Sequence, residues 1–124
     1  MSRLLAALVL MGLAWAQVPV TITYYHAVPG QTDSTPDVAA CGPISMAPLW
    51  PGDYVIALSR DLFRRELCGA HILLRWDGGI IAGVVWDTMN KLFYRYADIL
   101  VPNGQRWAPG KVRGMLYWDW TGGY

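Results

Sequence analysis

The strongest constraint on the fold is a series of short apolar runs that are separated at close intervals by turn-forming residues. The runs are rich in β-branched and aromatic side chains, which favour strands. They cover residues 20–25, 54–58, 71–76, 80–86, 94–101 and 111–118. Asp77-Gly78-Gly79, between two of these runs, is typical of a tight hairpin turn. Many short strands with frequent turns predict a small all-β barrel or sandwich.

One segment departs from the strand pattern and predicts a short helix over residues 59–67. Ser59 or Asp61 can cap its first turn, and Cys68-Gly69 would end it. Residues 29–36 are polar and rich in turn formers, which predicts a loop. Since no internal repeat or low-complexity linker divides the sequence, we expect one domain.

The first sixteen residues have the pattern of a secretory signal peptide. Arg3 precedes an apolar run over residues 4–16, and small side chains at Ala14 and Ala16 predict cleavage before Gln17. A retained membrane anchor is the alternative, but the run is shorter than the roughly 20 residues that a spanning helix needs. We therefore expect a signal peptide at residues 1–16 and a secreted or periplasmic domain at residues 17–124, without membrane contact after cleavage.

The charge of the expected mature chain is balanced. The full sequence has 10 basic and 9 acidic residues, and cleavage removes Arg3, which leaves 9 of each. A nucleic-acid binder needs a basic surface that displaces counterions from phosphates, so we expect no nucleic-acid partner. Six of the 7 tryptophans lie in the expected mature chain, more than its small core can hide. Exposed tryptophans suit a surface that stacks on sugar rings or packs against a protein partner.

Two cysteines in an exported chain predict one disulfide, between Cys41 and Cys68. Metal binding is a poor alternative, because His26 and His71 lie far apart in the sequence and complete no cluster of ligands. A reactive free thiol is poorer still. We expect no metal and no other cofactor.

Common enzyme motifs are absent from the sequence, which leaves two carboxylates as candidate catalytic groups. Asp87 follows the apolar run 80–86, and Asp98 lies inside the run 94–101. A partly buried carboxyl group has a raised pKa and can act as a general acid towards a glycosidic oxygen. The structural alternative is that each aspartate accepts hydrogen bonds from backbone N–H groups of a turn.

Aromatic and imidazole side chains beside these strands are candidate ligand contacts. Alternation along the first strand sends one of Tyr24 and Tyr25 inward and the other outward. His26 follows directly and is able to hydrogen-bond a ligand. The complete set of candidate ligand-binding residues is Tyr24, Tyr25, His26, Trp86, Tyr96 and Trp118.

The order of these segments resembles the six-stranded double-psi β-barrel of the expansin, barwin and rare-lipoprotein-A group. Residues 40–42 resemble the A-C-G-Y segment of that group, residues 57–63 its A-L-S-x-x-L-F and residues 96–100 its H-F-D-L-S. The likeness extends over about residues 21–118. The other matching segments are Tyr24-Tyr25, Cys68-Gly69, Val85-Trp86-Asp87 and residues 110–114. The resemblance implies an all-β, six-stranded double-psi barrel with one short helix.

The resemblance also implies a site at the two aspartates. Asp98 matches the key carboxylate of the group, and Asp87 matches the aspartate beside it. Related endoglucanases have a second acid just after the tyrosine of the first strand, where this chain has His26. Expansins lack the same base and loosen walls without hydrolysis. Here Ala97 and Leu100 replace the phenylalanine and serine of the group, and we expect no second, carbohydrate-binding domain.

Three functional hypotheses follow. The first is a secreted barrel that binds cell-wall polysaccharide without hydrolysing it, with Asp98, Asp87 and Tyr24 in one groove. The second is a lytic glycosidase, of the transglycosylase type, which cleaves peptidoglycan with Asp98 as acid and then base. The third is an interaction protein, a protease inhibitor or a secreted effector, whose partner is another secreted protein.

Overall fold

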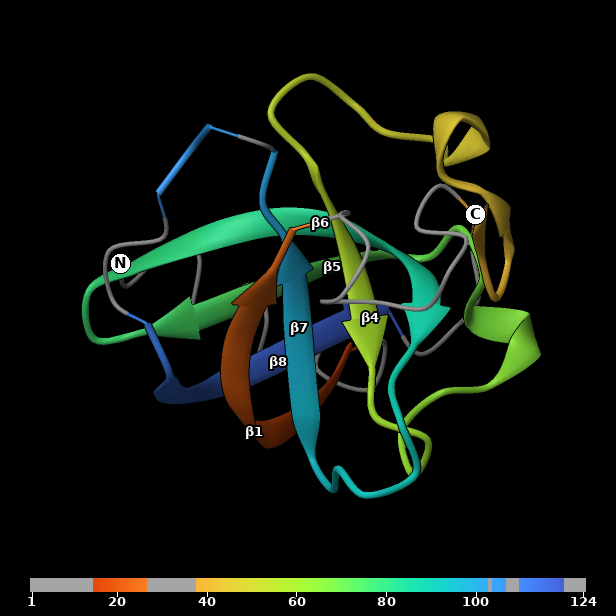
Figure 1. The fold of residues 1–124 in the computed structure, drawn as a ribbon. Coiled ribbons are helices and arrows are strands. Elements are labelled where there is room, and N and C mark those ends of the chain that lie inside the picture. The colour runs from red at the N-terminus through yellow and green to blue at the C-terminus, as the bar shows by residue number, and fades with distance from the viewer. Residues whose placement is uncertain (1–14, 27–37, 103, 107–109, 120–124) are drawn as a thin grey trace.

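The computed structural model describes residues 15–26, 38–102, 104–106 and 110–119. In these ranges six strands close into a barrel with the order β1-β7-β4-β6-β5-β8 (Figure 1). The barrel strands are β1 (Trp15–Tyr25), β4 (Tyr54–Leu58), β5 (His71–Trp76), β6 (Gly79–Thr88), β7 (Tyr96–Leu100) and β8 (Val112–Asp119). The described ranges hold no α-helix, only the 3-10 helices η2 (Ile44–Met46) and η3 (Arg65–Leu67).

The barrel mixes parallel and antiparallel pairs. β1 and β7 pair in parallel, as do β4 and β6, and the other neighbours are antiparallel. Parallel partners need crossover connections, so strands far apart in the sequence lie side by side. Figure 1 shows β7 next to β1, although most of the chain separates them. This topology confirms the predicted all-β fold and the six-stranded double-psi barrel.

Alternating side chains fill the barrel. On β7, Ala97 and Ile99 are completely buried, whereas Asp98 and Leu100 between and after them are only partly covered. This period of two is the pattern expected when one face of each strand points inward. The largest fully buried side chains are Ile22, Ile56, Leu58, Leu74, Ile99 and Leu116. Close packing of these side chains makes the barrel a rigid support for its loops.

Most strand bounds agree with the sequence pattern, and β4 and β5 have the predicted limits. β1 begins earlier than predicted because it pairs with β8 from Trp15 onward. β6 continues through Asp87 and Thr88, which were expected to lie beyond the strand. The two-residue strands β2 (Val38–Ala39) and β3 (Gly42–Pro43) form a small hairpin that was not predicted. The predicted loop over residues 29–36 lies outside the described residues.

The predicted helix over residues 59–67 is wrong in length and type. After one turn, in which Leu62 and Phe63 donate to the Ser59 carbonyl, the backbone becomes extended at Arg64. Asp61 does not cap a helix, because its carboxylate accepts from the backbone amide of Arg95, just before β7. Only η3 remains helical. Contacts with the barrel therefore outweigh the local helix preference.

The predicted disulfide is confirmed. Cys41 lies in the β2–β3 turn and Cys68 directly follows η3, with Cα atoms 5.7 Å apart. The flanking backbone is bound to the barrel as well, since the amides of Cys41 and Gly69 donate to carbonyls of β6. The small hairpin and the η3 segment are thus attached to one strand. Among the described residues, no helix is long and apolar enough to cross a membrane.

Candidate functional site

A bulge between β4 and β6 places the two predicted catalytic carboxylates in one row. The pairing changes from Ile56↔Val85 to Ala57↔Asp87, so Trp86 is skipped. On the other side of β4, Ala57 pairs with Asp98. Since paired residues point to the same face of a sheet, Asp87 and Asp98 flank Ala57 on the outside of the barrel. Without the bulge, Asp87 would be out of register with Asp98.

Asp98 is a poorly hydrated acid. Its carboxylate accepts a hydrogen bond from the Thr23 hydroxyl on β1 at 2.7 Å. Burial raises the pKa of Asp98 to about 6, the Thr23 hydrogen bond works against this rise, and the nearby charge of Asp87 adds to it. The Asp98 carboxyl group therefore exchanges its proton near pH 6. A raised pKa is what the sequence predicted for a partly buried carboxyl group.

Asp87 holds backbone in place. One carboxylate oxygen accepts from the amide of Ala40 at 2.9 Å and from the amide of Thr88 at 2.8 Å. The Ala40 amide belongs to the turn that carries Cys41, so this contact attaches the β2–β3 hairpin to β6. The structural role weighed for Asp87 in the sequence is thus present, beside its charge effect on Asp98.

Tyr25 completes this cluster. Its side chain is only 8% exposed, and its hydroxyl has no hydrogen-bond partner among the described residues. Burial raises the pKa of Tyr25 well above its ordinary value, and the charges of Asp87 and Asp98 raise it further. The ring packs with Ala57 and Met89, so the phenol is held neutral beneath the two acids.

The Asp98→Asn variant is expected to be more stable than the parent protein at pH 8, by on the order of 2 kcal/mol. The pKa of Asp98 in the folded state, about 6, exceeds its ordinary value of 3.8. The folded state therefore binds more protons than the unfolded state, and parent stability falls as the pH rises from about 4 to 6. Urea denaturation of both proteins at pH 4 and pH 8 measures this. An equal difference between them at both pH values would contradict the assignment.

The remaining predicted ligand residues differ in their surroundings. Tyr24 lies on the opposite face of β1 from Tyr25 and is exposed, with the His26 ring 5.8 Å away. The Nδ1 atom of His26 lies 2.9 Å from the carbonyl of Val101, so the imidazole joins β1 to the end of β7. These positions confirm that one of the two tyrosines is covered and the other is open.

The three predicted aromatic contacts on later strands have separate surroundings. The Trp86 indole donates to the carbonyl of Pro43 in the β2–β3 hairpin at 2.9 Å. Tyr96 packs against the Tyr25 cluster and contacts the Phe93 ring, with centroids 5.0 Å apart. Trp118 is partly buried against the barrel core. Of these three, Tyr96 lies two positions from Asp98 on β7 and therefore on the same face of that strand.

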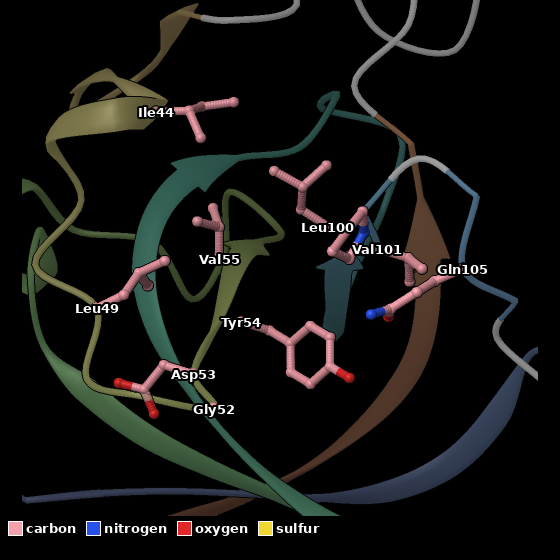
Figure 2. A pocket seen from close by; sticks show the side chains of 10 residues that line it. Ile44, Leu49, Gly52, Asp53, Tyr54, Val55, Leu100, Val101 and Gln105 are labelled. Atoms are coloured by element: carbon pink, nitrogen blue, oxygen red, sulfur yellow. The ribbon is translucent and has the colours of Figure 1, made fainter.

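One cavity lies away from the two acids. It has a volume of about 430 Å³ and opens where β4 begins and β7 ends (Figure 2). Leu49, Val55 and Leu100 give it an apolar lining. Its carboxylate, Asp53, already accepts from the Trp50 amide at 2.9 Å and lies 3.4 Å from Nδ1 of His71. Tyr54 and Gln105 also line the cavity, which does not coincide with the predicted site. No group of three or more potential metal-ligand side chains gathers in the described ranges.

An exposed apolar loop lies between β6 and β7 and was not predicted from the sequence. Leu92 is 82% exposed, Tyr94 is 66% exposed and Phe93 between them is 40% exposed. Single exposed apolar side chains are ordinary, but three in succession form a patch. The signal was available, since Asn90 begins a turn and an apolar triplet follows a lysine. The prediction instead assigned Tyr94 to a strand that begins only at Tyr96.

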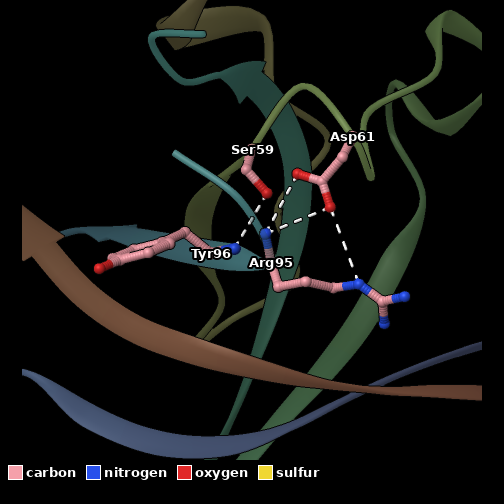
Figure 3. A network of polar contacts seen from close by, with 4 residues as sticks. All are labelled: Ser59, Asp61, Arg95 and Tyr96. Atoms are coloured by element: carbon pink, nitrogen blue, oxygen red, sulfur yellow. Dashed lines mark hydrogen bonds and ion pairs between the residues drawn. The ribbon is translucent and has the colours of Figure 1, made fainter. Parts of the chain in front are cut away.

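Polar contacts fix the base of this loop (Figure 3). Both oxygens of Asp61 accept from the Arg95 amide, at 3.1 and 3.2 Å, and the Ser59 hydroxyl accepts from the Tyr96 amide at 2.9 Å. Arg95 has a φ of 57°, a left-handed conformation uncommon for a side-chain-bearing residue. The contacts from Ser59 and Asp61, which follow β4, hold the backbone of Arg95 in this conformation.

By its fold, the protein belongs to the class of closed six-stranded mixed barrels. No protein-family model matches the sequence, and no curated protein matches it. Among solved structures, it is similar to the Streptomyces papain inhibitor (SPI), with a TM-score of 0.51 and 18% sequence identity. The alignment covers 83% of this chain and 93% of the inhibitor. At this identity the likeness shows the fold alone.

Proposed function

We propose that this protein is secreted and acts by binding another protein, as an inhibitor of papain-type cysteine proteases. The observation that carries the proposal is the exposed apolar loop, residues 90–95, on a barrel with the fold of a papain inhibitor. A loop that a rigid scaffold positions is the common way in which folds acquire binding functions. Among the hypotheses drawn from the sequence, the interaction protein therefore takes precedence over polysaccharide binding.

The physical properties of the barrel support this role. Protease–inhibitor complexes form between surfaces whose backbones move little on binding. A closed barrel, a disulfide and a fixed loop base meet that condition. The disulfide also supports the proposed location, because such bonds persist in oxidising compartments outside the cytosol or in the periplasm.

The purified mature chain is expected to inhibit papain and to form a complex with it at one-to-one stoichiometry. Hydrolysis of a fluorogenic peptide by papain, titrated with the protein, measures the inhibition constant, and size-exclusion chromatography detects the complex. A serine protease with a similar peptide assay is the control. If papain keeps its full activity at high micromolar inhibitor and no complex elutes, the proposed function is rejected.

A second candidate function rests on the cluster of Asp98, Asp87 and Tyr25. A carboxyl group with a pKa of about 6 beside another carboxylate is suited to proton transfer with a glycan. Incubation with cellulose or peptidoglycan, followed by sedimentation and mass spectrometry of the supernatant, separates binding from cleavage. Retention on either polymer that is lost in Asp98→Asn would favour this candidate. Release of soluble fragments would favour the lytic form of it.

A further inference from the structure

The loop of residues 90–95 combines exposure with order. All six residues are exposed, yet the backbone is bound at both ends and within the turn. The Asn90 side chain accepts from the Leu92 amide at 3.0 Å, and the Asn90 carbonyl accepts from the Phe93 amide at 3.1 Å. On the β6 side, Nε of Arg60 donates to the Met89 carbonyl at 3.0 Å. A loop without such contacts would have to become ordered on binding, at the expense of affinity.

The three apolar side chains of the loop have two different roles. The Phe93 ring packs edge-on against Tyr96, so it anchors the loop to β7. Leu92 and Tyr94, on either side of it, are the two most exposed of the three. Tyrosine is enriched among the residues that carry most of the binding energy of an interface, and adjacent exposed apolar side chains mark interaction sites. The loop thus offers two such side chains on a fixed base.

Basic residues surround this apolar tip. Arg60, Lys91 and Arg95 are exposed at the loop, and Asp61 is the carboxylate that pairs with Arg95. The guanidinium of Arg95 also lies over the Tyr94 ring, 5.6 Å from its centroid. The surface is therefore apolar at the tip and cationic at the rim. Its complement is a cleft with apolar pockets and an acidic border.

We propose that residues 90–95 are the segment that enters the substrate cleft of a cysteine protease, with Leu92 and Tyr94 in two apolar pockets. This inference rests on the proposed inhibitory function and names the surface that performs it. Phe93 and the Asp61–Arg95 contact keep the two anchors in place, and Lys91 and Arg60 face the acidic border of the cleft. Because the base is already ordered, the loop enters the cleft without first folding.

Substitution of the two anchors tests this inference. Leu92→Ser and Tyr94→Ser are each expected to raise the papain inhibition constant about tenfold or more, and the double variant about a hundredfold. Met46→Ser is the matched control, because Met46 is 68% exposed on η2, outside the loop, and is expected to leave inhibition unchanged. Thermal unfolding of each variant checks the fold. Higher salt is expected to slow association, since the rim is cationic.

The outcomes separate the two proposals. If the parent protein does not inhibit papain, the proposed function fails and this inference fails with it. If the parent protein inhibits and the double variant inhibits equally well, the loop assignment is overturned while the inhibitory function stands. A parent protein that self-associates through the loop, shown by a dimer that the double variant abolishes and that papain does not compete for, would also overturn it.

Discussion

Replacing both Cys41 and Cys68 by serine is expected to lower the free energy of unfolding by about 3.5 kcal/mol. The cysteines are 27 positions apart, and the chain-entropy treatment gives this value for a closed loop of that length. Domains of this size have total stabilities of roughly 5–15 kcal/mol, so the double variant should still fold but with a much smaller margin. Urea denaturation of both proteins at pH 7 measures the difference.

The parent protein in excess dithiothreitol is the matched control for this measurement. Its stability should equal that of the double serine variant, because both lack the same covalent constraint. The β2–β3 hairpin stays attached to β6 by its hydrogen bonds, so the native circular dichroism spectrum should persist below the transition. A loss of less than about 1 kcal/mol would show that the bond does not restrict the unfolded chain as inferred.

The Gly114→Ala substitution is expected to destabilise the barrel by about 3 kcal/mol. Gly114 lies on β8 between Val20 of β1 and Trp76 of β5. A Cβ atom there would meet the carbonyl oxygen of Arg75 and the side chain of Ile22, and the carbonyl is backbone that cannot turn aside. The strands would have to separate where the barrel closes. Urea denaturation measures the loss.

Arg113→Ala is the control for this prediction. Arg113 is the exposed neighbour of Gly114 on the same strand, and its replacement should change stability by no more than about 0.5 kcal/mol. Gly114→Ala with the stability of the parent protein would mean that β8 and β5 approach each other less closely than described. A β-propensity effect alone would act in the opposite direction, since alanine is the better strand residue.

The strands could be predicted from the sequence because their signals are local. Residues 54–58 and 71–76 are mainly apolar and bounded by turn residues, and they form β4 and β5 within those limits. The turn between β5 and β6 could also be predicted, because Asp77 and Gly78 are themselves turn-forming residues. The disulfide required only two cysteines and an exported chain.

The features that failed depend on contacts between distant segments. The helix predicted from Ser59 gives way because Ser59 binds the backbone of β7 and Asp61 binds the amide of Arg95 just before it, more than thirty positions later. The extension of β1 back to Trp15 requires β8 as a partner. Neither partner is visible within a local window, so periodicity and capping rules do not detect them.

For the candidate sites too, local signals could be predicted from the sequence and contacts between distant segments could not. The resemblance placed Asp98 and Asp87 together, and the register of β4 with its neighbours brings them to one row. The bulge that achieves this leaves no distinct signal in the sequence around Trp86. The 90–95 loop was missed because its apolar triplet reads as part of a strand, whereas its exposure depends on where β7 begins.

Amide hydrogen exchange of the protein with and without papain tests whether residues 90–95 enter the cleft of the protease. Papain is expected to slow exchange in the peptide that contains residues 90–95 and to leave exchange in the segments around Thr23 and Asp98 unchanged. Slowed exchange confined to the segments around Thr23 and Asp98, with the loop unaffected, would contradict this expectation.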